Sequence, residues 1–191
     1  MEEINESIRS NQSRPDDNPL LRFGPCGAKR LMPNPNLSAK AMTKAEADHA
    51  FALIHAFLST DSHYLDSSPA YGGGGEEALR NALALFLARP ELGFVWLVYE
   101  SGAAVACCVA CYAISTSAGG IVVKLDDVSV LPGREGQGIG TFLVDSLKTE
   151  LQRRCVKRID TSCHRDNSRA YAFYERQGFR PVREERLAHM L

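Results

Sequence analysis

The stretch "VLPGREGQGIGTFLV", Val130 to Val144, contains four glycines within eight residues, at 133, 136, 138 and 140. A strand-like apolar run precedes it and a helical pattern follows it. Glycine lets a backbone approach a ligand closely, and the first N–H groups of a helix lack helical acceptors and carry partial positive charge. The order strand, glycine turn, helix is therefore typical of a phosphate site, although an ordinary turn that needs glycine for its geometry also fits.

The patterns around this turn predict an α/β fold, a mixed sheet with helices on its faces. Tight turns join the first three strand-like runs into an antiparallel meander. The unit from 121 to 163, strand then helix then strand, predicts a parallel crossover. Strands are predicted over 93–100, 103–117, 121–131 and 156–163, with one or two more after 179, and helices over 43–60, 76–90, 139–151 and 167–177.

Length and composition limit the function classes. The chain has 191 residues and a net charge of -1, so no global field recruits nucleic acid or an acidic membrane. Residues 1–40 are polar and predict a flexible extension, with one short strand near 27–33 as an option, and residues 41–191 predict one domain. The N-terminus is acidic and no run is long enough to span a bilayer, so we expect a cytoplasmic location.

The six cysteines do not indicate a metal site. Cys108 and Cys111 have CxxC spacing, but no turn residue lies between them and no second pair follows. In a strand, Cys107 and Cys111 share one face and Cys108 takes the other. We predict buried, apolar thiols and no bound metal.

Two common phosphate-binding systems fit the glycine turn poorly. A P-loop needs Lys-Ser/Thr after its glycines, whereas Thr141-Phe142 follows Gly140 here. A dinucleotide fold has its glycines after an early strand, whereas these glycines follow an antiparallel meander in the second half of the chain.

Two motifs that follow one another along the chain support a third interpretation of the glycine turn. The run "LDDVSVLPGREGQGIGTFLVDSL" resembles the fourth strand, pyrophosphate loop and following helix of the GNAT superfamily of acyl-CoA-dependent N-acyltransferases. The run "NSRAYAFYERQGF" resembles its second signature. The resemblance covers about Phe94 to Phe179, and "LDDVSV" is similar to the branch with polyamine- and histone-acetylating members. The second signature matches at Asn167, Ala170, Tyr174, Gly178 and Phe179.

The resemblance implies acetyl-CoA as cosubstrate, in a sheet that splays between two parallel strands. Its pantetheine arm is expected beside the backbone of Val128 and Val130. Asn167 is expected to cap a helix and to contact the cofactor arm, and Tyr171 is a further cofactor contact and second-choice acid. The pyrophosphate is expected on the loop from Gly136 to Thr141, with contacts from Arg134, Gly136, Gln137, Gly138, Ile139, Gly140 and Thr141.

The resemblance also implies the catalytic groups. Tyr174 matches the family's general acid, which protonates the departing thiolate, although a helical core aromatic would fit the same pattern. Asp126 and Asp127 interrupt an apolar strand, where carboxylates are unfavourable. One of them is expected to act as a base or to attract a cationic amine, but alternation does not select between them.

Glu135 departs from the family pattern. It stands where relatives place Arg or Gln, and Arg134 lies one position earlier. Either Glu135 turns away from the ligand toward the dipole of the following helix, or Arg134 reaches the phosphates with Glu135 orienting it. In both cases backbone N–H groups do most of the binding.

The sequence therefore predicts direct acetyl transfer from acetyl-CoA to a primary amine. The alternative is a non-catalytic domain of the same fold that senses acyl-CoA. The acceptor is a small-molecule or peptide amine that the sequence does not identify, and neither nucleic acid nor a membrane is an expected partner. The end strands are a candidate surface for a homodimer.

Overall fold

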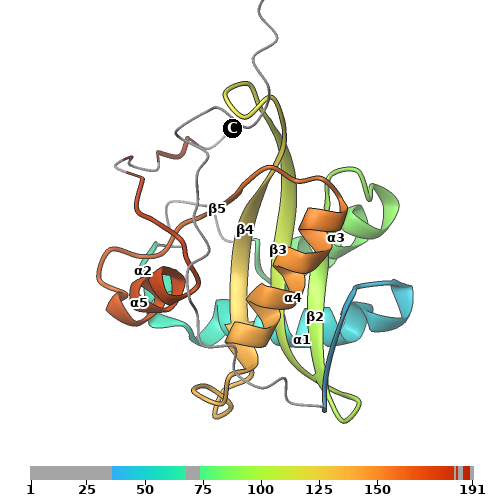
Figure 1. The fold of residues 1–191 in the computed structure, drawn as a ribbon. Helices are drawn as coiled ribbons and strands as arrows, with labels where there is room; N and C mark the ends of the chain where they lie inside the picture. The colour runs from blue at the N-terminus through green and yellow to red at the C-terminus, as the bar shows by residue number, and fades with distance from the viewer. Residues whose placement is uncertain (1–35, 68–73, 183, 185–186, 190–191) are drawn as a thin grey trace, which may run out of the picture.

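The computed structural model describes residues 36–67, 74–182, 184 and 187–189. The predicted mixed α/β fold is confirmed: a five-stranded sheet has helices on both faces (Figure 1). In chain order the elements are β1 Leu37–Ala41, the short 3-10 helix η3 Lys44–Glu46, α1 Ala47–Thr60, α2 Ser62–Ser67, α3 Gly75–Ala88, β2 Gly93–Glu100, β3 Ala103–Ser115, β4 Gly120–Val130, α4 Ile139–Arg153, β5 Ile159–Thr161 and α5 Ser168–Arg176.

The strands lie in the sheet in chain order, β1-β2-β3-β4-β5. The first four pair antiparallel, and β5 pairs parallel to β4. The predicted meander and the parallel crossover through α4 are thus confirmed.

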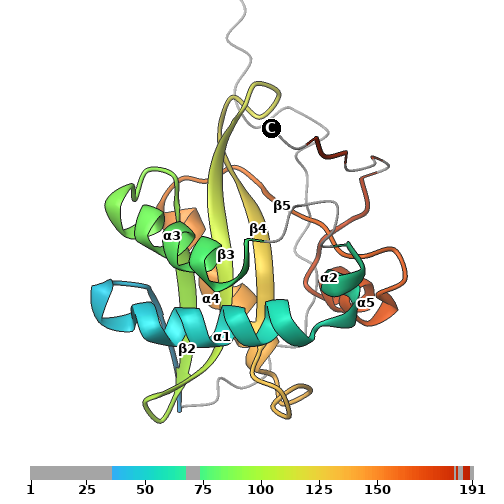
Figure 2. The same cartoon turned by 180° about the vertical axis from the view of Figure 1, so that it is seen from behind.

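Two apolar layers hold the helices to the sheet. Helix α4 covers one face, while α1 and α3 cover the other (Figures 1 and 2). Alternate residues of β2 divide between the layers, because successive strand side chains point to opposite faces. The α4 layer includes Trp96, Val98, Leu143, Leu147 and Leu151, and the α1/α3 layer includes Leu53, Ile54, Leu83, Val95 and Leu97.

The cysteines follow the same division. Cys108 lies in the α4 layer, and Cys107 lies in the opposite layer with Cys111 packed against it, as predicted. Burial raises the pKa of Cys107 to about 12. These are packing residues, and the described part of the chain contains no cluster of three candidate metal ligands. The free thiols are Cys107, Cys108, Cys111, Cys155 and Cys163; Cys26 lies outside the described residues.

The structure departs from the sequence-based expectations at three places. β1 begins at Leu37, so the sheet includes residues 37–40 that were assigned to the extension. Helix α2 was not predicted. No strand follows Thr161 within the described residues, although end strands were expected after 179. The strand considered near 27–33 lies outside the described residues.

β1 escaped prediction because its five residues, "LSAKA", are weakly apolar. They pair with β2, whose own apolar residues supply the packing. Among the described helices, none is long and apolar enough to cross a membrane.

Candidate active site

A cleft opens where β4 and β5 separate. The two strands pair only from Val123–Ile159 to Leu125–Thr161, and β4 continues to Val130 without a partner on that side. The cleft has a volume of about 930 Å³. Its walls come from the end of α1, from α2, from β4 and from the β5–α5 segment. In both views α2 and α5 lie side by side at this edge of the sheet (Figures 1 and 2).

A β-bulge turns both mid-strand carboxylates toward this cleft. Cys107 pairs with Ser129 and Val109 with Asp126, so one residue of β3 faces two of β4. The extra residue puts Asp127 at φ +48°, a left-handed backbone that is uncommon outside glycine. Strict alternation would have sent one carboxylate to each face, whereas Asp126 and Asp127 both line the cleft. The sequence did not select between Asp126 and Asp127, and the bulge allows both of them to face the cleft.

The two carboxylates have different surroundings. Asp126 forms an ion pair with Lys124, with 2.6 Å between Oδ2 and Nζ, and 26% of its side chain is exposed. Asp127 is held by the strained backbone of the bulge. Strain of this kind gathers at functional sites, where the surrounding structure enforces it.

Tyr174 projects from α5 into the same cleft. Its ring packs edge-to-face against Phe173 and Phe179, with ring centroids 5.3 and 5.4 Å apart. Burial raises the pKa of Tyr174 to about 12. The hydroxyl is therefore fully protonated at neutral pH, as a general acid must be.

Asn167 and Tyr171, which the sequence also predicted as site residues near Tyr174, differ in their relation to the cleft. Asn167 caps the helix, since its Oδ1 accepts a hydrogen bond of 2.9 Å from the N–H of Ala170, and it also lines the cleft. Tyr171 is 44% exposed and is not among the residues that line the cleft. The cleft geometry favours Tyr174 over Tyr171 as the acid.

The glycine loop delivers a row of N–H groups to the start of α4. The first helical hydrogen bond there runs from the N–H of Phe142 to the carbonyl of Gly138, so the N–H groups of Ile139, Gly140 and Thr141 have no helical acceptor. Gly138 caps the helix at φ +82°, and Gly136 has φ +76°. A Cβ at either position would meet no atom within 4 Å, so space outside the loop is open to a ligand.

Arg134 and Glu135 both bind groups within or next to the loop. The guanidinium of Arg134 pairs with Glu100 at the end of β2 and donates to Gln137 Oε1 at 3.0 Å. The Glu135 carboxylate accepts a hydrogen bond of 2.9 Å from the N–H of Gly133. Glu135 thus closes the loop on itself, and Arg134 anchors the loop to the β2–β3 hairpin instead of contacting Glu135.

The remaining wall is aromatic and polar. The rings of His63 on α2 and His164 after β5 stack, with centroids 5.3 Å apart. Asp61 accepts a hydrogen bond of 2.8 Å from the N–H of Tyr64, which fixes the start of α2. Both His63 and Tyr64 line the cleft.

Some residues escaped the sequence prediction. Thr161 and His164 also line the cleft. They lie at or just after the end of β5, and no sequence signal marks the end of this three-residue strand.

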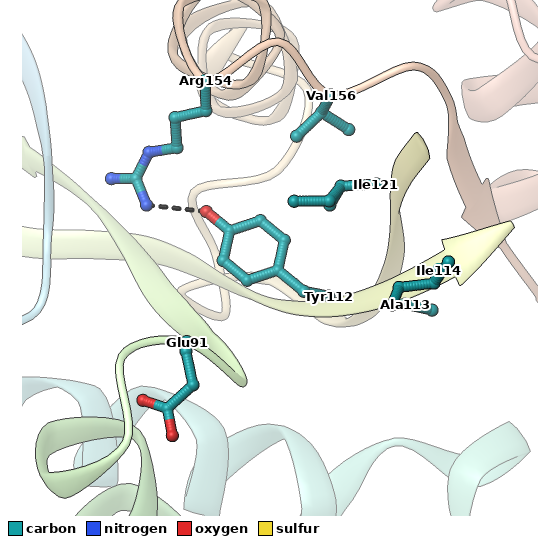
Figure 3. Close-up of a pocket in the computed structure, with 7 residues that line it drawn as sticks. All are labelled: Glu91, Tyr112, Ala113, Ile114, Ile121, Arg154 and Val156. Carbon is teal, nitrogen blue, oxygen red and sulfur yellow. Dashed lines mark hydrogen bonds between the residues drawn. The ribbon is translucent and has the colours of Figure 1, made fainter. Parts of the chain in front are cut away.

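A second hollow of about 550 Å³ lies beside the β3–β4 hairpin and shares no lining residue with the cleft. Figure 3 shows Ile114, Ile121 and Val156 around it, with Arg154 donating to the hydroxyl of Tyr112 at 2.8 Å. Arg154 is also paired with Glu150. The two aspartates and the partly buried tyrosine needed for proton transfer are in the cleft, which is therefore the candidate active site.

Comparison with known proteins identifies the family. Residues 40–179 match the model of the acetyltransferase (GNAT) family. The chain belongs to this family. The expected GNAT resemblance is thereby confirmed, and the matched range includes the bulged strand, the glycine loop and α5.

One curated relative of this GNAT domain is a mycothiol acetyltransferase from Beutenbergia cavernae. The two are 31% identical over 128 residues, which is 67% of this chain. The chain spans 41% of the length of that relative.

Solved structures share the fold. A possible acetyltransferase from Clostridium difficile superposes with a TM-score of 0.68 at 13% identity, covering 81% of this chain and 97% of that one. A predicted acetyltransferase with acetyl-CoA from Clostridium acetobutylicum gives a TM-score of 0.59 at 16% identity, covering 80% of this chain and 96% of that one. At these identities the likeness supports the fold of the GNAT domain alone.

Proposed function

We propose that this GNAT domain transfers an acetyl group from acetyl-CoA to a primary amine. One observation carries the proposal. The gap between β4 and β5 brings a partly buried tyrosine hydroxyl, Tyr174, and two carboxylates, Asp126 and Asp127, to the same cleft. An acid for the leaving thiolate and a base for the incoming amine are the two groups that this reaction needs.

The cofactor is proposed to lie along the unpaired part of β4. Backbone groups near Val128 and Val130 have no strand partner on the β5 side and are available to the pantetheine arm. The pyrophosphate then falls at the start of α4, where the N–H groups of Ile139 to Thr141 lack helical acceptors. Oriented N–H groups and the helix dipole both favour an anion there.

The transfer itself moves protons at both the amine and the thiolate. Asp126 or Asp127, directly or through water, removes a proton from the ammonium form of the acceptor. The amine nitrogen attacks the thioester carbonyl, a C–N bond forms, the C–S bond breaks, and the nitrogen loses its second proton to water. Tyr174 gives its proton to the departing thiolate and regains one from water, and the products are an acetamide and free coenzyme A.

The class of acceptor is the next question. The carboxylates Asp61, Asp126 and Asp127 line the cleft and favour a cationic amine, whether small or part of a peptide. The narrower resemblance to polyamine- and histone-acetylating members stays a prediction. The mycothiol acetyltransferase relative adds deacetylated mycothiol to the candidates.

A panel of amines tests the proposal. The protein is incubated with acetyl-CoA and, separately, with a polyamine, an amino acid, an aminoglycoside, a lysine peptide and deacetylated mycothiol. Acetylated product is detected by mass spectrometry. Product with at least one amine is expected. Binding of acetyl-CoA without product from any of them would favour the acyl-CoA sensor instead.

Glu135→Gln is expected to bind acetyl-CoA more tightly. The amide oxygen can still accept from the N–H of Gly133, while the negative charge near the proposed pyrophosphate is removed. The gain is about 1 kcal/mol or less, since the side chain is exposed to solvent. It should shrink as salt is raised, because ions screen exposed charges. Calorimetric titration at two salt concentrations measures it.

Glu135→Ala is the matched control for the hydrogen bond. It removes the charge together with the acceptor for Gly133, so the loop loses its closure and the gain in affinity is smaller or reversed. Weaker binding by Glu135→Gln at low salt would mean that the charge itself helps to build the site.

A further inference from the structure

An ion pair lies at the point where β4 leaves β5. Lys124 still pairs with β5, opposite Asp160, and the last pair joins Leu125 to Thr161. Asp126 is thus the first residue of β4 beyond the paired section. Strand residues two apart point to the same face, which brings Lys124 Nζ to 2.6 Å from Asp126 Oδ2.

The ion pair lies on the face of the sheet that α1 covers. The β3 partners are Cys111, opposite Lys124, and Val109, opposite Asp126, and both partners belong to the α1/α3 layer. Residues directly opposite in an antiparallel pair share a face, so the two charged side chains share that face as well. Tyr174 packs against the α4 layer instead. A thioester in the gap would therefore have the acid on one side and Asp126 on the other.

The Lys124 side chain carries the same chemical group as the proposed acceptor, a primary alkylammonium ion. Asp126 lines the cleft, so a carboxylate of the resting site already holds the kind of ion that it would receive from an acceptor. The pair is also open to exchange: 45% of the Lys124 side chain and 26% of the Asp126 side chain are exposed. An ion pair in contact with water shifts an equilibrium by about fivefold at most.

We propose that Lys124 is a specificity-determining residue, whose ammonium group competes with that of the acceptor for Asp126. This inference rests on the proposed acetyl transfer. A simple cation gains little when it replaces one ammonium group at Asp126 by another. An acceptor with further contacts in the cleft gains those contacts in addition, so the competition selects for it. The acceptor also binds against the like charge of Lys124, which stays close by on its flexible side chain.

Lys124→Gln tests the competition, since it removes the charge and keeps a polar side chain. With an acceptor from the amine panel, KM should fall by about two- to fivefold, while kcat and the Kd of acetyl-CoA change by less than about twofold. The fall should shrink as salt is raised, because ions screen exposed charges. Lys124→Arg keeps the charge and should show no fall. An unchanged or higher KM in Lys124→Gln would overturn the inference, since loss of a merely structural contact would not lower KM.

Lys40→Gln is the matched control for net charge. Lys40 also pairs with a carboxylate at the surface, with 2.7 Å between Nζ and Glu46 Oε1, and 54% of its side chain is exposed. It lies on β1, at the opposite edge of the sheet from β5. KM should therefore stay within about twofold of the wild type. An equal fall in both variants would mean that net charge acts and not the contact with Asp126, and would also overturn the inference.

A second readout needs no turnover. Carbon-13 NMR of lysine labelled at Cε, with Lys124 assigned through Lys124→Arg, follows the ion pair directly. Propylammonium chloride, with ionic strength held constant by sodium chloride, should move the Lys124 signal, whereas the neutral analogue 1-propanol should not. In Asp126→Asn the pair is absent, so propylammonium should leave the Lys124 signal in place.

The two readouts together separate this inference from the proposed function. An unmoved Lys124 signal in a protein that acetylates amines would overturn the competition alone. A Lys124 signal that moves with propylammonium, in a protein that acetylates no amine of the panel, would overturn the proposed acetyl transfer and leave Asp126 as a site for ammonium ions.

Discussion

Tyr174→Phe is expected to lower kcat by about a hundredfold or more, while the Kd of acetyl-CoA changes by less than about twofold. The lost interaction forms as the thiolate leaves, so it belongs to the transition state and not to the bound ground state. Steady-state kinetics with the best acceptor, together with calorimetric titration of acetyl-CoA, measures both quantities.

The Phe variant should fold normally. The Tyr174 ring makes edge-to-face contacts with Phe173 and Phe179, and phenylalanine retains the ring. Tyr171→Phe is the matched control, since it removes a hydroxyl from the same helix at a position that is 44% exposed. We expect wild-type kcat from it. A near-normal kcat in Tyr174→Phe would remove Tyr174 from the mechanism.

The pH dependence gives an independent check. Because burial raises the pKa of Tyr174 to about 12, the acid keeps its proton across the working range and loses it only as pH rises through that value. The pH–rate profile should therefore show no alkaline decline from Tyr174 below about pH 11. A decline near pH 8 that disappears in Tyr174→Phe would contradict this assignment.

Much of the fold could be predicted because its patterns are local. The apolar runs of β2, β3 and β4 are long, and the stripe on α4 repeats at helical spacing. β1 and α2 were missed because each is short and owes its stability to neighbours: β1 pairs with β2, and α2 is fixed by Asp61. Local propensity carries little information about such elements.

The site could be predicted only as far as its motifs extend. Tyr174 and the glycine loop lie in motifs; Tyr174 lines the cleft and the loop leads into the start of α4. The joint exposure of Asp126 and Asp127 depends on a bulge, a matter of register between two strands that neither strand encodes alone. The position of Thr161 in the cleft depends on where β5 stops pairing with β4. That point follows from the separation of the two strands and not from the residue itself.

The glycine loop leads to the second large expected effect. In the wild type, acetyl-CoA at a hundredfold excess over its Kd should stabilise the native state by about 2.7 kcal/mol, since a ligand that binds only the folded protein shifts the equilibrium. Gly138 caps α4 at φ +82°, beside the N–H groups proposed to hold the pyrophosphate. A larger residue there both strains the left-handed backbone and places carbon atoms in the path of the anion.

Gly138→Val should therefore lose most of the thermal shift caused by acetyl-CoA. The backbone strain alone would also lower the stability of the free protein, so a control must carry the same strain away from the helix start. Gly133 provides it: its φ is +81°, and a Cβ there, as at Gly138, would meet no atom within 4 Å. Thermal unfolding with and without acetyl-CoA should show both free variants destabilised to a similar degree. Gly133→Val should keep the ligand-induced shift and Gly138→Val should not. An intact shift in a folded Gly138→Val protein would place the pyrophosphate away from the start of α4.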